Sequence, residues 1–367
     1  MNDVSSIESL ALPHVAAMRA YVPGMQPTEP GWVKLNTNEN SFPPSPKVIE
    51  AIQRELADGA RGLRLYPNPT SKTLREAIAA HHGIEVNCVL AGNGCDDVLN
   101  LLMRVFCSAE RPAGMCVPSY SLYTTLRSIQ GAPMREVAFD RSMELPVDDI
   151  AQCGANIFFL TSPNAPTGVG FAPQSIAGLL EKFPGILVVD ETYAPFAPED
   201  CVSLLADHPR LVIVRSFSKA YALAGMRVGY ALAHPEVISL LDRVRDSYNL
   251  DRLAQAAAVA AICDQDYYTD ATMQIIAERE RAAADYERRG WFAYKSVANF
   301  HFVEPRDKQG EASGEVAKDL FEFLTAQKIL VRAFPNHALT QSFLRISVGG
   351  AEEMQRLTQV LDEWQTK

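Results

Sequence analysis

Apolar positions recur along the chain with two spacings that replace each other several times in its first two thirds. Apolar residues three or four apart, as at Val48, Ile52 and Leu56, predict amphipathic helices. Short unbroken apolar runs, as over 157–160 and 186–189, predict strands that are buried on both faces. Helices are expected over 46–58, 71–82, 120–129 and 173–183 and after 92–94, and strands over 88–91, 114–117, 156–160, 186–189 and 211–214. This alternation is typical of an α/β protein whose mostly parallel sheet is covered by helices on both sides.

The pattern changes after Tyr230. Helical spacing dominates from 235 to 290, and the tail then alternates over 297–303 (β), 312–327 (α), 329–332 (β), 343–348 (β) and 351–364 (α). A chain of 367 residues exceeds one ordinary domain of ~150 residues. We therefore predict an N-terminal arm over 1–35, a large domain over 36–265, and a small α+β C-terminal domain over 266–367 that packs with the arm.

Composition and charge exclude several classes of protein. Hydrophobic residues make up 47% and charged residues 21%, which is typical of a globular chain. The net charge is −10, so no basic excess is available for nucleic acid. No apolar run approaches the ~18 residues that cross a bilayer, and no Lys or Arg precedes Arg19, as one would in a signal peptide. We expect a cytoplasmic protein with neither a membrane nor a nucleic-acid partner.

The seven cysteines do not suggest a disulfide framework or a metal site. Their number is odd, and they contain no C-x-x-C pair. We expect mostly buried thiols in a reducing compartment, and no metal.

Side chains that can carry chemistry follow four of the predicted strands. In chain order they are the Gly92-Asn93-Gly94 turn at a helix N-terminus, Asn164, Asp190 with Tyr193, and Lys219 after Ser216 and Ser218. Ligands of open parallel sheets bind beyond the carboxyl ends of the strands, so these groups are expected at one edge. A lysine after a strand is by itself usually a surface residue. A lysine, a carboxylate and an anion cradle together suit a cofactor with an aldehyde, a ring nitrogen and a phosphate, which is pyridoxal phosphate.

Two stretches resemble the signature of class I/II aminotransferases of fold type I. They are Asp190-Glu191-Thr192-Tyr193 and the block 216–230, SFSKAYALAGMRVGY. Further pieces resemble the histidinol-phosphate aminotransferase branch: 21–24 (YVPG), 35–40 (LNTNEN), 66–67 (YP), 92–97 (GNGCDD) and 345–349 (RISVG). The resemblance spans about 12–364. It implies a large domain with a mostly parallel central sheet flanked by helices, and a small α+β C-terminal domain.

The resemblance also implies roles around pyridoxal 5'-phosphate. Lys219 would hold the cofactor as a Schiff base and, once freed by substrate, would move the proton of the reacting carbon. Asp190 would keep the ring nitrogen protonated. Tyr193 and Asn164 would hydrogen-bond the ring's phenolate oxygen. The phosphate would be held by hydroxyl, guanidinium and helix N-terminal N–H groups of Ser216, Ser218, Arg227, Gly94, Cys95 and Asp96.

Two tyrosines complete the implied cofactor site. Tyr120 would stack on the pyridine ring, although an ordinary core aromatic is the alternative. Tyr66 matches a residue that the family lends to the phosphate of the neighbouring subunit. We therefore expect a homodimer.

Substrate identity depends on arginines. Arg345 matches the residue that holds the substrate carboxylate in most of the family, through a bidentate guanidinium. Arg332 occupies the place of a second arginine in the histidinol-phosphate branch, where both bind a phosphate. Its alternative is a surface ion pair worth ~0–1 kcal/mol. Tyr21 and Asn38 are further candidates for contact with the substrate.

Several positions depart from the usual pattern of the branch. They are Ala165 for Asn, Thr192 for Ala, Ala222 for Gly, Ser41 and Ser247 for Pro, and Cys95-Asp96-Asp97 for Ser-Asp-Glu. None removes a group that the cofactor needs, but neighbours of the cofactor shape the substrate pocket.

Three classes of function follow. The first is a ping-pong aminotransferase that acts on small molecules. Its preferred substrates are L-histidinol phosphate as amino donor and 2-oxoglutarate as keto-acid acceptor, and histidine biosynthesis uses the same reaction in the opposite direction. An aromatic or other L-amino-acid aminotransferase is the alternative within this class. The second class is a decarboxylase of phosphorylated amino acids with the same cofactor. The third is a non-catalytic regulator, which the acidic charge and the lack of a DNA-reading extension disfavour.

Overall fold

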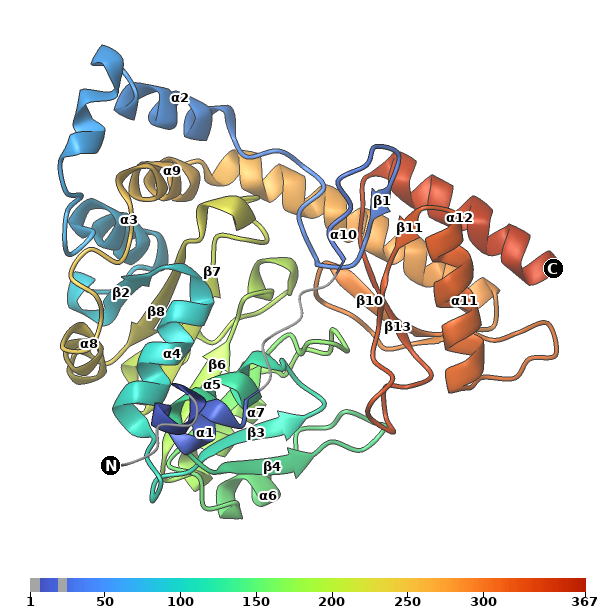
Figure 1. Ribbon diagram of the computed structural model, residues 1–367, viewed down its shortest axis with the longest axis horizontal. Helices are drawn as coiled ribbons and strands as arrows, with labels where there is room; N and C mark the ends of the chain where they lie inside the picture. Colours follow the sequence, from blue (N-terminus) through green and yellow to red (C-terminus); the bar gives the residue numbers. More distant parts are fainter. Residues whose placement is uncertain (1–6, 19–24) are drawn as a thin grey trace.

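A computed structural model describes residues 7–18 and 25–367 (Figure 1). In this part of the chain a seven-stranded sheet has the order β2-β8-β7-β6-β5-β3-β4. Its neighbouring strands are parallel except at β8, which is antiparallel to β2 and β7. The strands are β2 (Val89–Gly92), β3 (Ala113–Val117), β4 (Met134–Ala138), β5 (Ile157–Thr161), β6 (Ile186–Asp190), β7 (Leu211–Ser216) and β8 (Gly229–Ala233).

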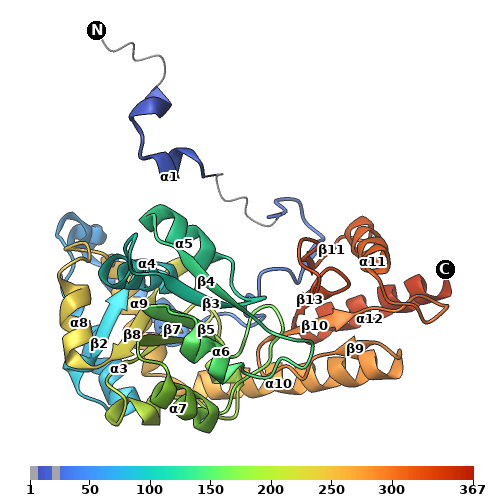
Figure 2. The ribbon, with the colours of Figure 1, turned by 90° about the horizontal axis from the view of Figure 1, so that it is seen from below.

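Helices cover both faces of this sheet, as the sequence predicts (Figures 1 and 2). The α4 and α5 helices pack with α8 on one face, and α3, α7 and α9 lie on the other. The helices are α2 (Pro46–Glu55), α3 (Lys72–His82), α4 (Gly94–Phe106), α5 (Leu122–Gln130), α6 (Val147–Gln152), α7 (Pro173–Lys182), α8 (Pro235–Asp242) and α9 (Arg252–Ile262).

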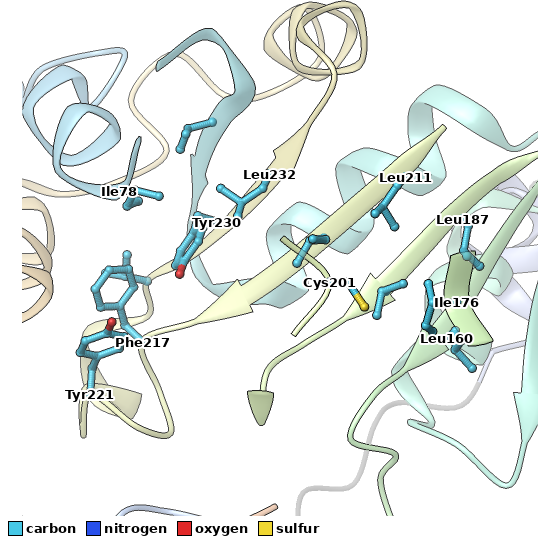
Figure 3. Close-up of a cluster of buried hydrophobic side chains, with 14 of the residues drawn as sticks. Ile78, Leu160, Ile176, Leu187, Cys201, Leu211, Phe217, Tyr221, Tyr230 and Leu232 are labelled. Atoms are coloured by element: carbon cyan, nitrogen blue, oxygen red, sulfur yellow. The ribbon is translucent and has the colours of Figure 1, made fainter. Parts of the chain in front are cut away.

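Side chains of the central strands alternate between two apolar clusters. In β6, Leu187 and Val189 face one cluster and Val188 faces the other. Figure 3 shows the first cluster, in which Leu187 lies close to Ile176 of α7. Fully burying a leucine or isoleucine side chain contributes ~1.5–3 kcal/mol, so these strands are fixed in register by their apolar faces. The same alternation directs Asp190, two residues after Val188, toward the face that α4 and α5 cover.

The C-terminal part of the chain forms a smaller layer beside the main sheet (Figure 1). An antiparallel sheet of order β12-β13-β10-β9 packs with α11 and α12, and the long helix α10 runs between the two parts. The elements of this C-terminal part are α10 (Gln265–Arg288), β9 (Phe292–Ala293), β10 (Phe300–Glu304), α11 (Gly314–Ala326), β11 (Ile329–Leu330), β12 (Arg332–Ala333), β13 (Leu344–Ser347) and α12 (Ala351–Thr366). The division at residues 265 and 266 stays a prediction.

The N-terminal segment contacts both parts. The short helix α1 (Pro13–Ala16) lies next to α5 (Figure 2). The His14 ring lies against Gly131. The strand β1 (Val33–Lys34) pairs in parallel with β11. Short 3-10 helices are η1 (Ile7–Leu10), η2 (Asp58–Arg64), η3 (Val86–Cys88), η4 (Ala194–Phe196), η5 (Val202–Ala206) and η6 (Ala224–Met226).

The structure adds elements that the apolar pattern did not predict. β8 contains Tyr230, so the sheet continues through the point where the sequence pattern changes. β4 and α6 are also additional, since the β4 sequence Met-Arg-Glu-Val-Ala carries two charges and lies at the sheet edge. No helix in residues 7–18 or 25–367 is long and apolar enough to cross a membrane.

Candidate active site

A cavity of about 310 Å³ opens where β5, β6 and β7 end and α4 begins. It brings together most of the residues that the sequence singles out. Those that line it are Asn38, Cys95, Asp96, Tyr120, Asp190, Tyr193, Ser216, Ser218, Lys219, Arg227 and Arg345. Residues that are far apart in the sequence, from Asn38 to Arg345, therefore meet at the sheet edge that the strand order predicts.

Lys219 follows β7 and points its amine into this cavity. Its Nζ donates a hydrogen bond to the Thr37 carbonyl over 2.9 Å and lies 5.9 Å from the centre of the Tyr193 ring. Burial, together with the positive charge of Arg345, lowers the pKa of Lys219 to about 8. A large neutral fraction of the amine is therefore present slightly above neutral pH, as a nucleophile requires.

Asp190 ends β6 and is only 2% exposed. Its Oδ1 accepts hydrogen bonds from the Thr192 hydroxyl (2.7 Å) and the Thr192 N–H (3.1 Å). Its Oδ2 accepts one from the Tyr123 hydroxyl over 2.9 Å. Burial raises the pKa of Asp190, and these donors oppose that rise because they stabilise the ionised form.

The start of α4 forms the anion cradle. Gly94, the first residue of the helix, has φ +81°, and the N–H groups that follow lack partners within the helix. Gly229 on β8 packs so close that a β-carbon there would lie 2.4 Å from the Cys95 nitrogen. The Arg227 guanidinium packs on Gly94 and donates to Asp96 over 3.2 Å. N–H groups, a cation and two serine hydroxyls thus surround one end of the cavity.

Asn38 and Tyr193 form a second buried pair in the cavity wall. The Asn38 side-chain amide donates to the Tyr193 hydroxyl over 3.0 Å, and Ser347 holds both the backbone N–H and the side-chain oxygen of Asn38. Burial raises the pKa of Tyr193, so its hydroxyl stays protonated. Asn38 therefore orients Tyr193, and its direct contact with substrate stays a prediction.

Arg345 of β13 also lines the cavity. One of its terminal nitrogens donates to the Asn36 carbonyl over 2.9 Å, and its guanidinium carbon lies 5.4 Å from the ring centres of Phe300 and Phe334. Arg332 is the direct cross-strand partner of Arg345 in the β12–β13 pair, so the two arginines are adjacent. Arg332 itself is outside the residues that line the cavity.

Other predicted residues have different surroundings. Asn164 is buried beside the cavity, and its amide donates to the Pro118 carbonyl over 3.3 Å. Tyr66 is 77% exposed and stacks on Tyr248 with ring centres 4.4 Å apart. Tyr120 lines the cavity and its hydroxyl donates to Asp96 over 3.3 Å. Their roles toward a cofactor stay predictions, and Tyr21 lies outside the described residues.

The sequence analysis missed four residues that belong to the site. Tyr123 contacts Asp190 from outside the cavity lining, whereas Thr161, Thr37 and Glu39 line the cavity. Glu39 accepts hydrogen bonds from Lys34 and Thr37, which lower its pKa although partial burial raises it. Tyr123 was detectable in principle, since it lies three residues after Tyr120 at helical spacing.

The groups around the cavity fit one type of molecule. An anion cradle at the start of α4, which Gly229 allows β8 to approach closely, a buried carboxylate and a lysine with a lowered pKa match a phosphate, a basic ring nitrogen and an aldehyde. Pyridoxal phosphate carries these three groups.

Comparison with known proteins agrees with this chemistry. A sequence profile described as "Aminotransferase class I and II" matches residues 30–361. The histidinol-phosphate aminotransferase of Geotalea uraniireducens is 43% identical over 95% of this chain and 98% of its own length. That of Syntrophotalea carbinolica is 43% identical over 94% and 96%. The crystal structure of histidinol-phosphate aminotransferase from Sinorhizobium meliloti in complex with pyridoxal-5'-phosphate is 27% identical, with a TM-score of 0.82 over 91% of this chain and 90% of that one. The chain belongs to the class I and II aminotransferases.

Proposed function

We propose that this protein is a pyridoxal-phosphate-dependent aminotransferase that exchanges an amino group between L-histidinol phosphate and 2-oxoglutarate. The observation that carries the reaction class is the single cavity onto which Lys219, Asp190 and the α4 N-terminus open. The names of the relatives that are about 43% identical over nearly the whole chain support the substrate. The Sinorhizobium meliloti complex supports the cofactor. A cytoplasmic location is part of the same proposal.

Pyridoxal phosphate, when bound, supplies an aldehyde that captures the substrate amine and a ring that accepts the electron pair released at the substrate's α-carbon. Ser216, Ser218, Arg227 and the first N–H groups of α4 would hold its phosphate. Asp190 would accept a hydrogen bond from its ring nitrogen. Tyr193 would hydrogen-bond its phenolic oxygen.

Lys219 would carry the proton during the reaction. Its lowered pKa allows the amine to exist neutral, take the proton from the substrate's α-carbon and deliver it to the carbon of the cofactor's aldehyde group. The Thr37 carbonyl, which accepts a hydrogen bond from the amine in the structure, would keep the side chain within the cavity between the two transfers. Burial of the surrounding residues would exclude water from this step.

Arg345 and Arg332 would select the donor. Their cross-strand pairing places two guanidinium groups on neighbouring strands, which suits a phosphate dianion better than a single carboxylate. Arg332→Ala is expected to weaken use of histidinol phosphate far more than use of a simple amino acid. Equal losses for both substrates would remove Arg332 from phosphate recognition.

A half-reaction tests the substrate. The loaded protein is mixed with L-histidinol phosphate and, in parallel, with phenylalanine, glutamate and threonine phosphate, without any keto acid, and the cofactor absorbance is followed. Conversion at the lowest concentration of histidinol phosphate supports the proposal. Better conversion by an amino acid would contradict the substrate but not the reaction class. Release of carbon dioxide over repeated turnovers would identify a decarboxylase.

We further propose that the active unit is a homodimer in which Tyr66 serves the neighbouring cavity. Its exposed ring is outside the residues that line the cavity of its own chain, which supports a role across an interface. Co-expression of Tyr66→Ala chains with Lys219→Ala chains tests this. Hybrid dimers would restore one intact cavity and hence part of the activity, whereas the absence of any gain over the separate variants would contradict the exchange.

A further inference from the structure

We propose that Thr192 and Tyr123 are positioning residues that hold Asp190 in its ionised form and reserve one of its acceptor positions for the cofactor's ring nitrogen. This inference deepens the proposed function and rests on it. Its basis is the hydrogen-bond arrangement around Asp190 in the cavity wall, in which Thr192 stands in place of the alanine that is usual in the branch.

The acceptor positions of Asp190 are nearly filled by the protein. An ionised carboxylate offers about four lone-pair positions, two on each oxygen. Both positions of Oδ1 are used by Thr192, through its hydroxyl at 2.7 Å and its N–H at 3.1 Å. One position of Oδ2 is used by the Tyr123 hydroxyl at 2.9 Å. Among the described residues, these donors leave one lone-pair position of Asp190 unused, on Oδ2. The Asp190 side chain lines the cavity, so a bound molecule can reach this position.

The hydrogen bonds around Asp190 have a defined direction. An ionised carboxylate can only accept, so the Tyr123 hydroxyl must donate to it. The Tyr123 oxygen then accepts from the Thr161 hydroxyl, 2.7 Å away, and Thr161 in turn can accept from Ser119 over 3.3 Å. Thr161 is held in place because it is the direct partner of Asp190 across the β5–β6 pair. The whole series of donors therefore points at the carboxylate.

A neutral Asp190 would break this arrangement. Its carboxyl proton would have to displace one of the donors or point into the cavity, where it would take the place of the ring N–H. Burial alone favours the neutral form, because Asp190 is 2% exposed and Tyr123 is fully buried. The hydroxyl donors counter this effect, since hydrogen bonds to an ionised acceptor are the stronger kind.

The consequence concerns where one proton lies. With its donors in place, the proton affinity of Asp190 is lower than burial alone would give, and the proton would stay on the ring nitrogen. Without the Thr192 hydroxyl, the proton affinity of Asp190 rises and the proton moves from the nitrogen toward the carboxylate. The ring would then accept electrons less readily, although every residue that contacts the cofactor directly would still be in place.

Isosteric variants separate this role from packing. Thr192→Val keeps the shape and removes the hydroxyl, Thr192→Ser keeps the hydroxyl, and Tyr123→Phe removes the second donor. Thr125→Val, on α5 but outside the residues that line the cavity, is the matched control. Each variant is loaded with pyridoxal phosphate labelled with ¹⁵N in the ring, and the ¹⁵N chemical shift is followed against pH. The pH profile of the half-reaction with L-histidinol phosphate is measured in parallel.

In Thr192→Val the ring ¹⁵N shift is expected to lie closer to the unprotonated value throughout the pH range in which the wild-type nitrogen is protonated, because loss of one hydrogen bond to a charged group changes the ratio of the two proton positions by about 10- to 100-fold. Tyr123→Phe is expected to shift it in the same direction. Thr192→Ser should restore most of the wild-type titration, and Thr125→Val should match wild type throughout. The half-reaction rate of Thr192→Val should fall by about tenfold or more throughout the pH range in which the wild-type ring nitrogen is protonated.

Two results would overturn the inference, and they are distinguishable. A loaded Thr192→Val variant whose ¹⁵N titration coincides with that of wild type would show that Thr192 is merely structural, while the proposed function stands. A wild-type protein that takes up no pyridoxal phosphate would overturn both. Should Tyr123→Phe fail to fold, the Val and Ser variants at position 192 decide the matter alone.

Discussion

Gly229 makes the anion cradle possible, and its replacement by alanine gives a sharp test of that geometry. A β-carbon on Gly229 would lie 2.4 Å from the Cys95 nitrogen and 2.5 Å from the Gly94 carbonyl carbon. Both contacts are backbone atoms, so no side chain can rotate away to relieve the overlap. Gly229→Ala should therefore push the start of α4 away from β8.

The size of the effect follows from these distances. Ordinary contact begins at 3.4 Å, so the helix start must move by about 1 Å (3.4 − 2.4 Å). A hydrogen bond of about 2.9 Å between an α4 N–H and a phosphate would then exceed bonding range. Loss of one hydrogen bond to a charged group costs about 1.5–3 kcal/mol, which corresponds to about 10- to 100-fold weaker binding of pyridoxal phosphate. Strain that is not relieved by movement would instead lower the free energy of unfolding by about 1–3 kcal/mol.

The assay is the dissociation constant of pyridoxal phosphate, measured by absorbance titration of the cofactor-free protein, with circular dichroism to verify folding. Gly225→Ala is the matched control, since a β-carbon there meets no described atom within 4 Å. The control should bind the cofactor like wild type. If folded Gly229→Ala also binds it with wild-type affinity, the close approach of β8 to α4 is not what forms the phosphate site.

Three further outcomes are expected. Uptake of pyridoxal phosphate by the cofactor-free protein should accelerate as pH rises through about 8, because the pKa of Lys219 is lowered to about 8 and the neutral amine is the reactive form. A midpoint near the ordinary pKa of lysine would contradict the argument that burial lowers the pKa of Lys219. Arg345→Gln should move that midpoint upward, since the charge of Arg345 is the second cause of the lowered pKa, and an unchanged profile would refute the coupling. Arg215→Met should lower the free energy of unfolding by about 3–5 kcal/mol, because it leaves Glu191, 2% exposed and 2.7 Å away, without its cation. Lys182→Met removes the exposed 2.7 Å salt bridge to Asp148 and should change the free energy of unfolding, measured by urea titration, by about 0–1 kcal/mol. If the two variants lose the same stability, burial does not determine how much an ion pair matters to folding.

The type of fold could be predicted because the central strands are apolar on both faces. Runs such as 157–160 and 186–189 are found as β5 and β6, and helices such as 71–82 agree within a residue with α3. β8 was missed because its glycine start and its antiparallel direction break the βαβ rhythm on which the prediction relied. Edge and two-residue strands such as β1 and β9 carry too few apolar positions to leave a pattern.

The cavity residues that follow strands could also be predicted, because a strand's end fixes where its next side chains lie. Asp190, Ser216 and Lys219 needed no long-range information beyond the strand order. Thr37 and Glu39 could not be placed in this way, since they precede the first strand of the main sheet and reach Lys219 through a loop.

The surroundings of Asp190 show where sequence reasoning ends. Thr161 and Asp190 become partners only through the register of β5 against β6, and Tyr123 reaches them from helix α5, which covers that face of the sheet. Each is an ordinary polar residue in its own segment, with no motif of its own. Yet burial would protonate an isolated carboxylate at this depth, so the cofactor's acid–base partner depends on these neighbours as much as on its own identity. In this fold the reactive groups can be found at the strand ends, whereas the groups that set their protonation are found only by the register between strands.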